Sequence, residues 1–100
     1  MLRRSMSDDL RVYLGLDDVL GDLRHARRQG DLGRLALLAY CEVRRWARQA
    51  GEPDLAASSL ALITDSPPPS RLEFLRRVDG LIAKLEATRQ RLTAQQRSLG

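Results

Sequence analysis

Three consecutive prolines, Pro67 to Pro69, constrain the fold of this chain more than any other feature, because no helix continues through such a run. They lie in a polar segment, residues 65–70, that is typical of an extended and stiff connection. The regions on both sides are rich in leucine and alanine, which favour helix. A chain of 100 residues has the size of a single domain. We therefore expect one helical domain over residues 7–100, with a turn at 65–70, and a flexible tail over residues 1–6.

Two glycines mark further helix ends. Gly30 and Gly51 each follow a segment with helical periodicity, and glycine is common just beyond the end of a helix. Asp31 is suited to cap the helix that follows Gly30, and Pro53 is suited to the first turn of the helix that follows Gly51. Together with the proline run, these signals predict four helices in an all-α, four-helix bundle-like fold.

The segment between Ser7 and Gly30 carries two apolar patterns. Residues 10–14 alternate between apolar and polar side chains, as in a short strand. Leucines also recur at steps of three and four residues as far as Leu23, which indicates a helix capped by Ser7. Because the helical pattern continues without a turn signal, we favour a helix. A short strand at 10–14 and a helix break at Gly15 are the alternatives.

The second segment has the clearest helical pattern of the chain. Eight apolar residues fall on one face at helical spacing: Leu32, Leu35, Ala36, Ala39, Val43, Trp46, Ala47 and Ala50. Four more, Leu37, Leu38, Tyr40 and Cys41, widen this apolar surface in the first half. We expect this helix to be the most buried element, with Leu35, Ala39, Val43, Trp46 and Ala47 in the core.

The third helix is expected to be short, and the fourth long. The inner face of the third is predicted to hold Leu55, Ala56, Leu60 and Ile63. Ser70 and Glu73 have the spacing of a capping box, and Glu73 and Arg77 that of an i,i+4 ion pair. The fourth helix would run from about Arg71 for about 27 residues, or about 40 Å at 1.5 Å per residue.

The apolar residues of the fourth helix follow a heptad register, in which Arg89 and Gln96 occupy two further core positions. The shorter helices of the chain are not expected to cover its last three turns, where Leu92 and Leu99 lie. We therefore predict a homodimer or partner interface formed by Leu75, Val78, Ile82, Leu85 and Leu92.

The chain has a formal net charge of +4, which raises the question of nucleic-acid binding. Without Arg3 and Arg4 of the tail, the 17 basic residues fall to 15 against 13 acidic ones, so the rest is close to neutral. Six arginines are candidates for a basic patch: Arg24, Arg27, Arg28, Arg44, Arg45 and Arg48. We favour solvated charged faces for them, with a nucleic-acid-binding regulator as the alternative function.

The sequence shows no constellation for catalysis. His25 is the only histidine, and the only cysteine, Cys41, lies in an apolar run where a thiol usually behaves as a small buried hydrophobe. Asp17 and Asp18 are adjacent, which is typical of a helix cap. No catalytic residue, metal-ligand set or cofactor site is predicted, and we do not expect an enzyme.

The remaining features favour a binding protein. The longest apolar run, residues 35–41, is far shorter than the ~20 residues that span a bilayer, so we expect no membrane contact and a cytoplasmic location. A motif-free helical domain with a surplus amphipathic helix is suited to binding by helix packing. We expect a bacterial-type regulator or adaptor, an interaction module that binds another protein and forms a homodimer.

Overall fold

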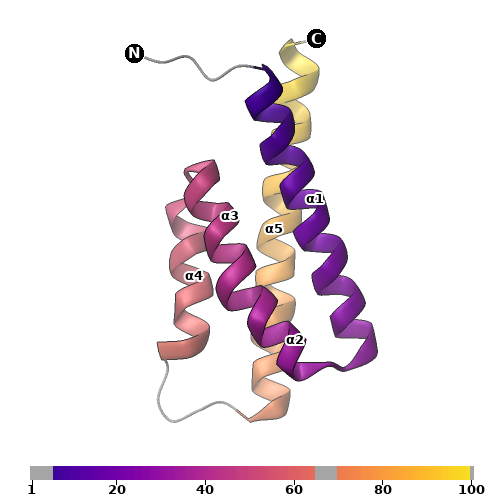
Figure 1. The fold of residues 1–100 in the computed structure, drawn as a ribbon, viewed down its shortest axis with the longest axis vertical. Helices are drawn as coiled ribbons and strands as arrows, with labels where there is room; N and C mark the ends of the chain where they lie inside the picture. The colour runs from indigo at the N-terminus through magenta and orange to yellow at the C-terminus, as the bar shows by residue number, and fades with distance from the viewer. Residues whose placement is uncertain (1–5, 65–69, 100) are drawn as a thin grey trace.

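The computed structural model describes residues 6–64 and 70–99, and within these ranges all regular structure is helical, with no strand. The elements are α1 (Met6–Gln29), α2 (Leu32–Leu37), the π-helical turn η1 (Leu38–Glu42), α3 (Val43–Ala50), α4 (Pro53–Thr64) and α5 (Arg71–Leu99). Because α2, η1 and α3 follow one another without a break, the chain forms four helices (Figure 1). This confirms the predicted all-α fold. The predicted turn at 65–70 lies, except for Ser70, outside the described residues.

The two long helices, α1 and α5, run antiparallel side by side, and α3 and α4 form the other half of the molecule (Figure 1). The first turns of α1 lie beside the last turns of α5. We had expected these last turns to be uncovered, and for Leu92 this expectation was wrong, while the side chain of Leu99 lies outside the described residues. At 24 residues without a break, α1 extends about 36 Å and reaches them. Leu92 is accordingly half-buried against the core.

The helix α1 contains neither the strand at 10–14 nor the break at Gly15 that we considered, and it begins at Met6, one residue before the expected cap Ser7. Gly15 has a packing role instead. A Cβ atom added there would lie 3.2 Å from Cδ1 of Trp46, so the glycine lets the indole approach α1 closely. The indole Nε1–H then donates a hydrogen bond to the Val12 carbonyl oxygen at 2.8 Å.

Both predicted boundaries of the second helix are confirmed. Gly30 and Gly51 adopt left-handed backbone with φ of 67° and 72°, a conformation that glycine tolerates best. The Asp31 carboxylate accepts a hydrogen bond from the Arg34 backbone N–H at 3.1 Å and so caps α2.

The turn η1 contains a backbone irregularity for which the sequence offers no signal. The Val43 N–H bonds to the Leu38 carbonyl, five residues back, instead of to the Ala39 carbonyl. The hydroxyl of Ser59, a fully buried residue of α4, donates to the Ala39 carbonyl and lies 3.3 Å from the Tyr40 carbonyl oxygen. A side chain from α4 therefore compensates the carbonyl that the π turn leaves without its usual partner.

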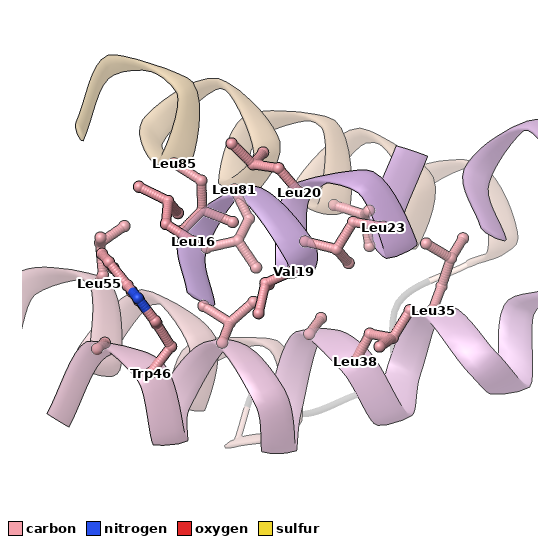
Figure 2. Close-up of a cluster of buried hydrophobic side chains, with 14 of the residues drawn as sticks. Leu16, Val19, Leu20, Leu23, Leu35, Leu38, Trp46, Leu55, Leu81 and Leu85 are labelled. Carbon is pink, nitrogen blue, oxygen red and sulfur yellow. The ribbon is translucent and has the colours of Figure 1, made fainter. Parts of the chain in front are cut away.

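The core lies between all four helices (Figure 2). The five predicted core residues, Leu35, Ala39, Val43, Trp46 and Ala47, are all buried. They pack against leucines of α1, Leu55 of α4 and a stripe of α5. Three expectations were wrong: Leu37 is 58% exposed, Leu60 is 39% exposed and Cys41 is exposed. The helix formed by α2, η1 and α3 packs mainly against α1 and α4, and its apolar surface is wider than the area that they cover.

One of the two hydrogen bonds of the predicted capping box is present at the start of α5. The Ser70 hydroxyl accepts a hydrogen bond from the Glu73 N–H at 3.2 Å. The Glu73 carboxylate pairs with Arg77, as expected from their i,i+4 spacing. The buried stripe of α5 consists of Val78, Leu81, Leu85 and Thr88. It keeps heptad-type spacing, but Leu81 and Thr88 take the places expected for Ile82 and Arg89, because α5 packs against both α1 and α4.

We expect Leu35→Ala to lower the free energy of unfolding by about 2–5 kcal/mol, because Leu35 is fully buried. Leu37→Ala is the matched control, since the same side chain two residues away is mostly exposed; its effect should stay within about 0.5 kcal/mol. Urea unfolding followed by circular dichroism measures both values. Similar losses for the two variants would contradict the packing described here.

We expect Ser59→Ala to cost about 1–3 kcal/mol, because it leaves the Ala39 carbonyl without the Ser59 hydroxyl in a buried position. Ser58→Ala, the neighbouring control, removes only an exposed hydrogen bond from Lys84 Nζ and should have little effect. Thermal unfolding of the two variants gives the comparison. An equal loss in both would show that the hydroxyl of Ser59 does not support the π turn.

Candidate functional site

A groove of about 480 Å³ lies between α1 and the helix formed by α2, η1 and α3. Its lining comprises Gly15, Asp18, Val19, Asp22, Arg34, Leu37, Leu38, Glu42, Arg45, Trp46 and Gln49. We call it the α1–α3 groove. Its volume lies within the usual range of ligand sites, roughly 300–1,000 Å³.

The floor of the α1–α3 groove is apolar. Figure 2 shows Val19 reaching from α1 toward the helix that carries Leu38 and Trp46. All three belong to the buried core, so the floor is held in place by packing on its inner side. Leu37, on the opposite wall from α1, is 58% exposed. An exposed leucine beside a fixed apolar floor is a suitable contact for another apolar side chain.

The walls of the α1–α3 groove carry charges that do not pair with one another. Asp18 and Asp22 stand one turn apart on α1, and within residues 6–64 and 70–99 neither forms an ion pair. The side chains of Arg34 and Arg45, on the facing wall, are also outside the ion pairs of these ranges. Counting Glu42, three acidic and two basic residues line the groove. The groove is therefore locally acidic in a chain with a net charge of +4.

The structure divides the six arginines of the predicted basic patch. Arg24 pairs with Glu86 of α5, and Arg27 with Asp79 at 2.9 Å. The hydrogen bond from Arg27 to the Asp79 carboxylate, together with its charge, raises the pKa of this guanidinium above its usual value. Two of the three patch arginines of α1 thus pair with α5, and only Arg28 remains of that cluster. On α3, Arg44 is half-buried, Arg48 is exposed and Arg45 lines the α1–α3 groove.

Of the predicted interface on α5, two residues belong to the core of the chain itself. Val78 and Leu85 are fully buried, so they have no surface left for a partner, and their assignment to an interface needs correction. Leu75, Ile82 and Leu92 are half-buried and pack against that core. The antiparallel α1 provides the covering that we had assigned to a second chain. Binding of another molecule by the remaining surface of α5 stays a prediction.

Cys41 and His25 are both exposed, so the predicted burial of the thiol was wrong. The described part of the chain contains no group of three or more side chains that could together hold a metal ion. In the same part of the chain, no helix has the length and apolar character needed to cross a membrane.

Sequence reasoning missed the α1–α3 groove. Asp17 and Asp18 were expected to be cap residues with diverging side chains; they do diverge, but both lie inside α1 and not at its end. Asp17 pairs with Arg89 of α5 at 2.8 Å, and Asp18 lines the groove. The spacing of Gly15, Asp18 and Asp22 along one side of α1 was the available signal.

We expect no submicromolar binding of duplex DNA or RNA at about 150 mM salt, because two of the six patch arginines, Arg24 and Arg27, pair with α5, and Arg45 lies in a groove with three acidic residues. Fluorescence anisotropy with a labelled duplex, repeated over a range of salt concentrations, provides the measurement. Tight binding at that salt, abolished in Arg44→Ala/Arg45→Ala/Arg48→Ala, would contradict this prediction and favour the nucleic-acid alternative.

Comparison of the chain with protein-family models, curated proteins and solved structures found no match. A function for the chain therefore has to be argued from its own geometry. The α1–α3 groove combines an apolar floor fixed by the core, an exposed leucine beside it, and charges on both walls that form no ion pair among the described residues.

Proposed function

We propose that this protein is a small interaction module, a regulator or adaptor, that holds a helical segment of another protein in the α1–α3 groove. The observation that supports this is Leu37, which is 58% exposed beside a floor formed by Val19, Leu38 and Trp46. Amphipathic helices bind such grooves by inserting a few apolar side chains spaced at three and four residues. The groove volume of about 480 Å³ is sufficient for a few side chains of that kind.

The walls of the groove add a requirement on the partner. Charges at the edge of an interface contribute mainly to selectivity and to the orientation of the bound segment. Asp18 and Asp22 on one wall and Arg34 and Arg45 on the other are free to meet charges of a bound helix. An apolar floor between two charged walls is suited to an amphipathic segment, which has an apolar stripe between polar flanks.

Cys41 offers a direct test of this proposal. It is the only cysteine of the sequence, it is exposed, and it directly precedes the groove residue Glu42. A short benzophenone reagent attached to its thiol, followed by irradiation in an extract of the native host, should produce an adduct with a partner protein. We expect Leu37→Asp to abolish the adduct, because a carboxylate at this position opposes insertion of an apolar side chain.

The matched control is Leu72→Asp at the start of α5. Leu72 is 78% exposed and lies outside the groove lining, so its replacement should leave the adduct unchanged. Failure to obtain an adduct that depends on Leu37 would contradict the proposal. An adduct of twice the mass of the chain would instead identify a second copy as the occupant, as in the homodimer expected from the sequence.

A further inference from the structure

We infer that the segment bound in the α1–α3 groove carries lysine or arginine along the flank that faces α1. This inference rests on the proposed function and specifies the chemistry of the partner. It is carried by Asp18 and Asp22, which line the groove on the α1 side. Both are exposed, and no ion pair among the described residues involves either of them.

The two carboxylates form a row rather than a single point of charge. They are four residues apart on one helix, so they are displaced along its axis by about 6 Å. Two basic side chains one turn apart on a bound helix have the same spacing, so each could pair with one of the two carboxylates at the same time. Arginine or lysine paired with a carboxylate forms the stronger class of hydrogen bond, particularly where an apolar floor excludes water from one side.

Three other acidic residues of α1 and α5 already form ion pairs within the chain. Asp17 pairs with Arg89, and the α5 carboxylates Asp79 and Glu86 pair with arginines of α1. Asp18 and Asp22 differ from these in facing the groove without an ion-pair partner in residues 6–64 or 70–99. Their negative charge is therefore available to a bound molecule.

The facing wall places a second condition on the partner. It carries Arg34 and Arg45 with Glu42 between them in the sequence, a mixed set with an excess of one positive charge. A segment that is basic on both flanks would meet repulsion there. We therefore expect a bound helix that is basic toward α1 and neutral or acidic toward α3.

The net charge of the chain limits the range of this recognition. At +4 the protein as a whole repels a basic segment, but screening at physiological salt acts over about 8 Å. The attraction of Asp18 and Asp22 consequently operates inside the groove and not during the approach. Raising the salt concentration should therefore weaken the bound complex.

Two synthetic helical peptides of about 20 residues provide the test, a length at which alanine-rich helices form in water. Both carry the same leucine stripe, and they differ in having lysine or glutamate along one flank. Binding to the full chain is measured by fluorescence anisotropy at about 150 mM salt. We expect the lysine peptide to bind about tenfold more tightly than the glutamate peptide, the effect of two partly exposed ion pairs.

Charge variants of the protein provide the controls. Asp18→Asn/Asp22→Asn should remove the preference, and Asp18→Lys/Asp22→Lys should reverse it in favour of the glutamate peptide. Arg34→Gln/Arg45→Gln, on the facing wall, should leave the preference for lysine intact. Because all four side chains are exposed, circular dichroism should show an unchanged fold in each variant.

The outcomes separate this inference from the proposed function. If both peptides bind equally and Leu37→Asp abolishes binding of both, the groove is a docking site but its acidic wall does not select a basic flank. If the lysine peptide binds and neither Leu37→Asp nor Asp18→Asn/Asp22→Asn changes its affinity, the groove is not the site and both proposals are wrong. If neither peptide binds, the inference is wrong, and the Leu37-dependent adduct decides the function alone.

Discussion

The contact between Trp46 and α1 is the interaction on which the rest of this structure depends. The indole lies against Gly15, where a Cβ atom would be 3.2 Å from its ring, and it donates a hydrogen bond to the Val12 carbonyl at 2.8 Å. Buried tryptophan combines a large apolar surface with one donor that needs a partner, and here one residue of α3 obtains both from α1. This contact sets the distance between the two helices, and the α1–α3 groove lies along the same pair.

The π turn η1 determines which side chains face outward on the wall opposite α1. An extra residue in the turn rotates the residues before it relative to those after it. Ala39 within the turn and Val43 directly after it remain buried, whereas Leu37 and Cys41 are exposed. The hydroxyl of Ser59 stabilises the irregular backbone by donating a hydrogen bond to the Ala39 carbonyl. The groove wall therefore depends on a residue of α4 that lies outside the groove.

The sequence was informative where a single residue type determines the local backbone, and less so where neighbours decide. Gly30, Asp31 and Gly51 allowed the boundaries of the second helix to be predicted, because left-handed backbone and side-chain capping favour particular residues. In the buried stripe of α5, Val78 and Leu85 were predicted correctly, but Ile82 and Arg89 were each one position away from the buried Leu81 and Thr88, since apolar spacing does not reveal that two helices pack on α5. The groove was missed because its residues come from segments that are distant in the sequence.

The ion pairs between α1 and α5 also encode how these helices align. Asp17 pairs with Arg89, Arg24 with Glu86 and Arg27 with Asp79. Along each helix the paired charges change from negative to positive, so opposite charges meet when the two helices run antiparallel. If α5 slid by one heptad, only one pair would survive, Arg27 with Glu86 in one direction or Arg24 with Asp79 in the other. Heptad-spaced apolar residues tolerate such a slip, because leucine meets leucine after each repeat. The charges therefore distinguish the native alignment from its nearest competitors, even though each exposed pair adds little to stability.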